Sequence, residues 1–294
     1  MEAILQSLIS GIVIGSIYAL VALGFALIYK STAVINFAQG ELLLFGAYIC
    51  LTLVVSLNIP FWVAFAATLI AATILGLLLE RFFLRPMIGE PIISIIMLTI
   101  GLASLLKAIL HLIWGSETLV FPEVFPTEPV RIGNVSISQV YLYSIGFAIV
   151  CLLLFNLYFR FSRSGIAMRA VANDQQAAQS MGISIKKIFA TAWAIAAVVA
   201  SIGGILIGNI NGVNSSLSSF GLKVFPAVIL GGLDSIPGAI VGGFVIGILE
   251  ALAGIYVDPL LEGGSKEVVP FIVLVIVLMI KPYGLFGTEE IEKV

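Results

Sequence analysis

Few ionisable side chains interrupt the long apolar runs of this 294-residue chain, and they are the first candidates for chemistry. Lys107 and His111 lie four residues apart, on one helical face with Ser104. The simpler interpretation is a lysine near the outer end of its run, whose long side chain brings the ammonium to the membrane surface. A functional role is the alternative. Glu250, near the outer end of another run, has the same two interpretations.

Motifs for hydrolysis and nucleotide binding are absent from the chain. It has no G-x4-G-K-[ST] loop, its single histidine excludes H-E-x-x-H, and G-x-S-x-G does not occur. Cys50 and Cys151 both lie in apolar runs, as small core residues do, without the spacing of a metal site. We therefore expect no catalytic residues, no metal and no cofactor. Acidic residues deep in the runs are too few for a proton relay, which leaves a passive or externally driven pathway.

Composition predicts the elements that must position these residues. The chain is 61% hydrophobic and 10% charged, with a mean hydropathy of +1.19. Its apolar runs are about 20 residues long and do not alternate, so an all-α polytopic bundle is expected rather than a barrel. We treat residues 1–294 as one transmembrane domain. The expected spans are 8–29, 42–57, 61–79, 92–114, 140–159, 188–208, 225–232, 236–256 and 268–280.

The distribution of basic residues predicts the orientation. With nine crossings and the N-terminus outside, the inner loops hold ten Lys and Arg residues and the outer loops three. This positive-inside bias places the segment 160–187 and the C-terminus in the cytoplasm. If 225–256 forms one crossing, the terminal assignments change. The inner set is Lys30, Arg81, Arg85, Arg160, Arg163, Arg169, Lys186, Lys187, Lys281 and Lys293, and the outer set is Arg131, Lys223 and Lys266. The net charge of −2 gives no indication of a nucleic-acid partner.

The polar segment 160–187 interrupts the apolar runs without resembling a slack linker. Its alanines favour helix, and we expect Asn173 to cap a short second helix over 174–181 that Gly182 ends. Apolar Met181, Ile183 and Ile185 lie beside that helix. A capped, Ala-rich helix outside the bilayer is typical of a docking surface, so we expect another protein to push on it.

Two polar breaks form a weak internal repeat, one near each end of the chain. Matching breaks in two halves are typical of a transport path, and irregular backbone at membrane depth persists only against protein or a water-filled cavity. We therefore expect non-helical, pore-lining segments at both breaks. The alternative is two ordinary cytoplasmic loops, with Glu41 and Asp234 at helix N-termini. The residues are Asn36, Phe37, Ala38, Gln39, Gly40 and Glu41, and Gly231, Gly232, Leu233, Asp234 and Ser235.

Four motifs, in the family's order and across nearly the whole chain, resemble the branched-chain amino acid permease family of ATP-binding-cassette (ABC) transporters, with the LivH-type subunit the most similar. They are INFAQGELLLFGAY, RSGIAMRAVANDQQAAQSMGI, FPAVILGGLDSIPGAIVGG and KPYGLFG. Within the second motif, Gln176-Ala177-Ala178 and Gly182 are similar to the E-A-A-x-x-x-G loop of ABC importer permeases. Gln176 stands where that pattern has glutamate. Its neutral amide cannot make a charge-assisted bond to a basic partner, which puts the exact contact with the ATPase in doubt.

The resemblance implies a type II-like ABC importer permease with broken or re-entrant segments, in a prokaryotic plasma membrane. Its partners would be a second related permease, two cytoplasmic ATPases and an extracytoplasmic binding protein that delivers leucine, isoleucine or valine. By position, the coupling helix and its turn would contain Arg169, Ala170, Asn173, Asp174, Gln176, Ala177, Ala178 and Gly182. Close relatives carry urea or amides, so the substrate stays open. The other function classes are a secondary transporter or channel, and a membrane scaffold.

Overall fold

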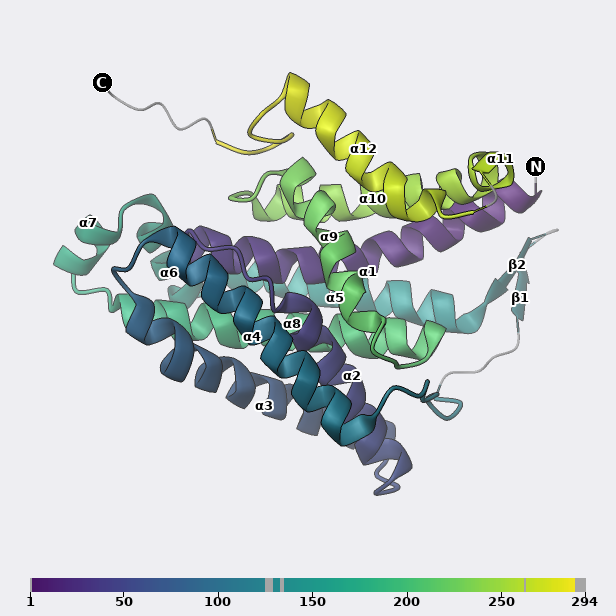
Figure 1. Ribbon diagram of the computed structural model, residues 1–294, viewed down its shortest axis with the longest axis horizontal. Helices are drawn as coiled ribbons and strands as arrows, with labels where there is room; N and C mark the ends of the chain where they lie inside the picture. Colours follow the sequence, from purple (N-terminus) through teal and green to yellow (C-terminus); the bar gives the residue numbers. More distant parts are fainter. Residues whose placement is uncertain (1, 125–128, 133–134, 262, 289–294) are drawn as a thin grey trace.

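The computed structural model describes residues 2–124, 129–132, 135–261 and 263–288, and the regular elements of this part of the chain are helices apart from one β-hairpin (Figure 1). The expected all-α membrane bundle is confirmed. The elements are α1 (Glu2–Thr32), α2 (Gln39–Val55), α3 (Phe61–Leu79), a π-helical turn (Glu80–Leu84), a 3-10 turn (Arg85–Met87), α4 (Ile92–Trp114), β1 (Pro129–Ile132), β2 (Val135–Ser138), α5 (Gln139–Phe161), α6 (Arg163–Asn173), α7 (Gln175–Ser180), α8 (Ile185–Asn211), α9 (Leu217–Gly231), α10 (Ile236–Tyr256), α11 (Asp258–Leu261) and α12 (Ser265–Ile280).

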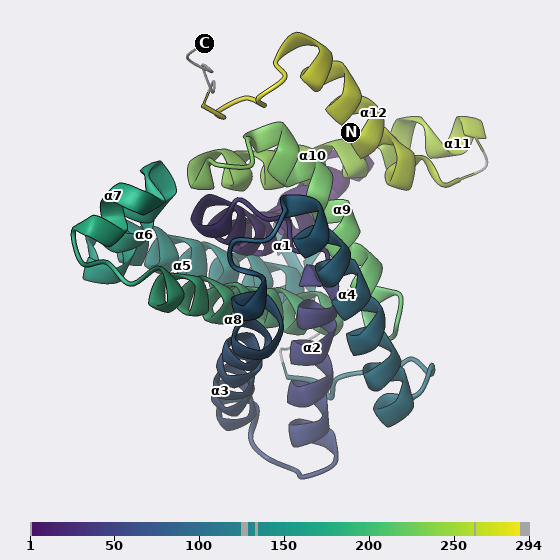
Figure 2. The same ribbon diagram turned by 60° about the vertical axis from the view of Figure 1, so that its left-hand side comes forward.

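Two long helices, α1 and α8, form the centre of the bundle. The apolar stretch of α1 is 89% buried and that of α8 is 78% buried, against 17% to 28% for α3, α4 and α5. The central helices pack on each other, and α10 packs along α1 (Figure 2). The outer surfaces of α3 and α5 are apolar, as expected of helices that face lipid.

The two ends of the molecule differ in charge. The N-terminus, the β1–β2 hairpin and α11 lie at one end, and α7 and the C-terminal segment lie at the other (Figure 1). Nine of the ten basic residues expected inside belong to helix ends or loops on the α7 side, whereas Lys293 lies outside the described residues. The positive-inside rule therefore turns the α7 end toward the cytoplasm.

Six of the described helices are long and apolar enough to cross a membrane, and α2 and α9 are shorter apolar helices. The spans expected at Phe61–Leu79 and Ile92–Trp114 match α3 and α4. A single crossing over 225–256 is wrong, because α9 ends at Gly231 and α10 begins at Ile236. The antiparallel β1–β2 hairpin was not expected in the outer loop.

Candidate functional site

Segment 160–187 contains two short helices, α6 and α7, at one end of the bundle (Figure 1). Ser162 begins α6, because its hydroxyl accepts a hydrogen bond of 2.9 Å from the backbone N–H of Gly165. Met168 and Val171 are each 1% exposed, and α6 packs against α1, α5 and α8. Helix α6 is therefore anchored to helices of the core.

Asp174, not Asn173, caps the second helix of this segment. Its carboxylate accepts a hydrogen bond of 2.9 Å from the backbone N–H of Ala177, whereas Asn173 is the last residue of α6. The extended backbone of Asp174, with φ −157° and ψ 110°, turns the chain between the two helices. A carboxylate also suits the positive N-terminal end of α7 better than an amide does.

Gly182 ends α7, as expected. Its φ of +84° lies in the left-handed region, and its N–H donates to the carbonyl of Gln179 at 3.0 Å. The N–H of Ile183 donates to the carbonyl of Ala178 at the same distance. This pair of bonds is the Schellman arrangement, in which glycine is favoured because it has no Cβ.

The expected coupling residues divide into a buried set and an exposed set. Ala178 is 4% exposed, Ala170 is half-buried, and Arg169 is turned back toward α5, where it donates to the carbonyl of Arg160 at 3.1 Å. The exposed side chains are those of Asn173, Asp174, Gln176, Ala177 and Gly182, together with Gln175, Gln179, Ser180 and Met181.

Met181, which the sequence places beside the expected docking helix, is 85% exposed. It stands at the end of α7 and is a large apolar side chain that this short helix leaves exposed. Its apolar character beside a predicted docking helix was the signal in the sequence. An exposed methionine is well suited to protein contact, because its flexible thioether adapts to a partner surface.

The first break, residues 33–38, packs against α4. Thr99 donates to the carbonyl of Ile35 at 3.3 Å and accepts from the N–H of Phe37 at 3.5 Å. Since Thr99 is seven residues into α4, the break lies about 10 Å from the cytoplasmic start of that helix. Gln39 donates at 3.3 Å to the carbonyl of Ala196, about 16 Å into α8. The irregular backbone of this break is therefore packed against α4, inside the end of that helix.

The side chains of the first break satisfy each other. Asn36 donates to the side-chain oxygen of Gln39 at 3.2 Å, and its own oxygen accepts from the N–H of Ala38 at 3.0 Å. Asn36 and Gln39 are 1% and 0% exposed. These two side chains therefore hold the turn rather than facing an open space.

Gln39, Gly40 and Glu41 are helical, contrary to expectation. They form the first turn of α2, which begins inside the bundle and crosses α9 at close range. A Cβ at Gly40 would collide with the backbone carbonyl of Ser218, and one at Gly221 would collide with the backbone of Gly40. The sequence resembles a loop here because polar residues and glycine are needed for buried hydrogen bonds and for this crossing.

The second break lies at the cytoplasmic end of the bundle and is covered by the C-terminal strap, residues 281–288. Gly231 is the last residue of α9, and Gly232 has φ +107°. The strap donates from Leu285 and Phe286 to the carbonyls of Leu230 and Gly231, at 2.8 and 3.0 Å.

Asp234 fixes this second turn to two other parts of the chain. Its carboxylate accepts from the N–H of Thr288 at 3.2 Å and also from the hydroxyl of Thr288. Lys30, at the end of α1, donates to the backbone carbonyl of Asp234 at 3.0 Å. Of the two interpretations of this break, an ordinary cytoplasmic turn is the better one.

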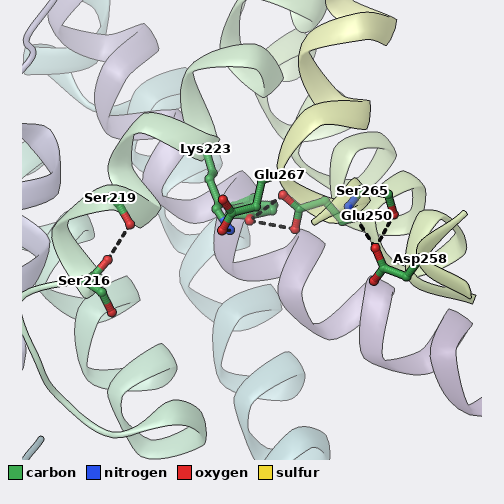
Figure 3. Close-up of polar contacts among 8 residues, drawn as sticks. Ser216, Ser219, Lys223, Glu250, Asp258, Ser265 and Glu267 are labelled. Atoms are coloured by element: carbon green, nitrogen blue, oxygen red, sulfur yellow. Dashed lines mark hydrogen bonds and ion pairs between the residues drawn. The ribbon is translucent and has the colours of Figure 1, made fainter. Parts of the chain in front are cut away.

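Polar contacts also tie the outer ends of the helices (Figure 3). Lys223 on α9 forms a 3.1 Å ion pair with Glu267 on α12. Glu250 on α10 is 8% exposed and accepts hydrogen bonds of 2.8 and 2.9 Å from the hydroxyl of Tyr18 on α1. The Glu250 carboxylate is therefore partnered inside the bundle, which explains its presence without a role in transport.

Comparison with known proteins identifies the family of this chain. The model of the branched-chain amino acid transport system permease component matches residues 7–278. The chain is 32% identical to the high-affinity branched-chain amino acid transport system permease protein LivH of Escherichia coli strain K12, over 99% of this chain and 97% of that protein. It is 34% identical to the corresponding permease protein BraD of Pseudomonas aeruginosa, over 99% and 98%.

A solved structure has the same fold. PsaBC from Streptococcus pneumoniae, in complex with Fab, superposes with a TM-score of 0.51 and 15% sequence identity, covering 96% of this chain and 93% of that chain. At this identity the likeness concerns the fold alone. The family match and the full-length relatives carry the assignment. The chain is a multi-pass membrane protein that belongs to the family of branched-chain amino acid transport permeases.

Proposed function

We propose that this chain is the membrane-spanning permease subunit of an ATP-driven importer that carries leucine, isoleucine or valine into the cytoplasm. The observation that carries the energy-coupling part is α7, a six-residue capped helix held away from the bundle with Met181 exposed. A helix this short is unstable by itself, so its two ends are fixed by Asp174 and Gly182. Such a helix is suited to receive force from another protein.

The energy comes from separate chains in this proposal. The sequence has no P-loop, so two cytoplasmic ABC ATPase subunits bind and hydrolyse ATP. A second, related permease completes the path, and an extracytoplasmic binding protein delivers the amino acid. The whole chain acts as one permease domain without catalytic residues.

Closure of the ATPases moves α6 and α7 as one lever. Arg169 fixes α6 to the end of α5, while Met168 and Val171 fix it to the core. Because α6 is packed against α5 and α8, displacement of the lever tilts these helices and switches the path between outward and inward access. Ala170 and Ala178 pack inside the lever, and Gln176 and Ala177 face the ATPase.

The transport path is lined or supported by residues at the first break. Phe37 and Glu41 are the candidates for lining it, and Asn36, Gln39 and Gly40 hold the irregular backbone in place. At the second break, Gly231, Gly232 and Asp234 anchor the C-terminal strap beside the inner opening. The binding protein supplies most of the substrate recognition.

Co-purification and transport test this function directly. The chain is isolated from native membranes with its associated subunits, reconstituted into liposomes, and assayed for uptake of labelled leucine with urea as the comparison solute. We expect a co-purifying P-loop ATPase and leucine uptake that requires ATP and the binding protein. Uptake that follows an ion or concentration gradient and ignores loss of the ATPase would instead identify a secondary transporter or channel.

A further inference from the structure

A groove lies between the outer ends of α3 and α5, and its volume is about 860 Å³. The end of α2, the α2–α3 turn, the first turn of α3, residues 122–124 and the first half of α5 line it. We propose that this groove binds a membrane phospholipid. An acyl chain lies against the apolar walls, and a headgroup that carries an ammonium, as in phosphatidylethanolamine, lies at the rim.

The wall on α5 is one apolar helical face with a gap in its middle. Leu142, Gly146 and Val150 follow each other at intervals of four residues, over about 12 Å of helix. Nothing lies within 4 Å of the position that a Cβ of Gly146 would occupy. This glycine therefore packs against no other helix, and its missing side chain leaves space in the groove.

Aromatic rings form the wall on α3. Trp62 is 62% exposed, and its ring meets those of Phe61 and Phe65 edge to face. The helices come together where the ring of Phe65 contacts that of Phe147 on α5, with the ring planes at 90° and the centroids 5.3 Å apart. The wall is therefore held by ring contacts on both helices.

The size of the groove suits a hydrocarbon chain. A methylene group fills on the order of 30 Å³, about the share of one water molecule in the liquid, so there is room for an acyl chain of about 16 carbon atoms and the glycerol that carries it. Apolar walls give water few hydrogen-bond partners. Hydrocarbon instead supplies the dispersion contacts that the lining atoms would otherwise lack.

The surface around the groove indicates lipid, not a partner protein, as its surroundings. Helix α3 has no charged residue, and α5 has none before Arg160, in its last turn. By contrast, α4 exposes Lys107 and His111. Ionisable side chains within the membrane face protein or water. The α4 side of the bundle is therefore the one that suits a partner or the path, and the α3–α5 side is the one that suits hydrocarbon.

Aromatic residues place the groove at the outer boundary of the hydrocarbon. Trp62 is the second residue of α3 and Tyr143 is the fifth residue of α5, and both line the groove. Tryptophan and tyrosine are enriched where the membrane meets water. At this level, a phospholipid brings its headgroup to the rim and its acyl chain to the walls.

The charge at the rim selects the headgroup. Glu123 is exposed, and among the described residues that line the groove it is the only charged one. Its carboxylate attracts the ammonium of phosphatidylethanolamine and repels an anionic headgroup. An exposed charge pair of this kind gives a preference of about twofold to fivefold.

The site lies on the helix that carries the coupling segment. Helix α5 ends at Phe161, and α6 begins at Arg163. A lipid in the groove therefore contacts the helix that leads directly into α6. The inference does not depend on the transported solute, because its readout is lipid binding.

The experiment measures quenching of Trp62 by brominated lipid. The complex is reconstituted in vesicles of phosphatidylethanolamine and phosphatidylglycerol in equal parts, with identical acyl chains. The bromine is on the chains of one lipid in the first preparation and of the other lipid in the second. The emission of Trp62 is obtained by subtracting that of the Trp62→Phe complex. We expect quenching about twofold to fivefold stronger when phosphatidylethanolamine carries the bromine.

Two variants test the groove itself, and assembly of the complex serves as the check on folding. Glu123→Gln removes the charge at the exposed rim, so both brominated lipids should quench equally. Gly146→Phe fills the groove, so the extra quenching by phosphatidylethanolamine should be lost. The matched control is Gly101→Phe, which adds the same ring in open space on α4 and should leave the preference unchanged.

Three results would overturn the proposal. Equal quenching by the two lipids in the unaltered complex would show contact without a site. A preference that persists in Gly146→Phe would place the lipid outside the groove. Absence of quenching by either lipid would show that protein, such as the second permease, covers Trp62. A complex that takes up no leucine yet keeps the lipid preference would contradict the proposed function and leave this site standing.

Discussion

Gly182 offers the sharpest test of the coupling segment, because a substitution there changes backbone conformation without creating a clash. Its φ of +84° is unfavourable for any residue with a Cβ, yet nothing lies within 4 Å of the position that a Cβ would occupy. The Gly182→Ala variant therefore strains the turn that ends α7 and leaves the packing around it unchanged.

The size of the effect follows from the left-handed conformation. Placing alanine there costs about 1–2 kcal/mol. Every 1.4 kcal/mol is tenfold in an equilibrium constant, so the fraction of molecules with a correctly closed turn falls by roughly fivefold to thirtyfold relative to open forms. Since α7 has only six residues, it has little stability of its own to offset this loss.

The assay compares leucine uptake and ATP hydrolysis in the reconstituted complex. We expect Gly182→Ala to reduce leucine uptake and the binding-protein stimulation of ATPase activity, with membrane insertion unchanged. Gly182→Asn should be milder, because asparagine tolerates the left-handed region better.

Gly264 is the matched control for Gly182. It has the same φ of +84° and nothing within 4 Å, but it precedes α12 at the outer end of the bundle. Gly264→Ala carries the same backbone strain, and we expect it to leave coupling intact. Equal effects of the two substitutions, or normal coupling in Gly182→Ala, would refute the assignment of α7 to energy transfer.

Three further predictions concern other contacts. Arg169→Glu puts a negative charge at the C-terminal end of α5, which costs about 1 kcal/mol; uptake per ATP hydrolysed should fall, while Arg169→Lys keeps most of it. Gly40→Ala forces the α2 and α9 backbones apart, so the free energy of unfolding should fall by about 1–3 kcal/mol in thermal melts. Gly101→Ala, in open space on α4, should not lower the free energy of unfolding, because alanine favours helix more than glycine does. Asp234→Ala removes the hydrogen-bond acceptor of Thr288 and should speed proteolysis of the C-terminal strap. An unchanged rate of cleavage would contradict the role of Asp234 in holding the strap.

Helix starts and ends were predicted best from the sequence where they depend on local chemistry. Pro60 and Pro91 each stand immediately before a helix, and the predicted starts of α3 and α4 are those observed. Gly182 was recognised as the end of α7 for a similar reason, since glycine favours the left-handed turn. Asn173 was mistaken for the cap because Asn and Asp are equivalent on sequence alone.

Prediction failed where distant parts of the chain decide the structure. Gln39 is helical because its side chain reaches the backbone of Ala196, 157 positions away. The cover over Asp234 comes from Thr288, at the far end of the chain. The β1–β2 hairpin was missed because its strands are only four residues long.

Cross-linking from α7 tests the central claim most directly. Cys50 and Cys151 are both buried and free, and replacing them with alanine leaves a chain in which Met181→Cys supplies the only thiol. In the complex purified from native membranes, we expect this introduced thiol to cross-link to a nucleotide-binding subunit. In intact cells, we expect it to be protected from membrane-impermeant reagents added outside. Labelling of the introduced thiol from outside, or absence of a cross-link to any nucleotide-binding chain, would contradict the account.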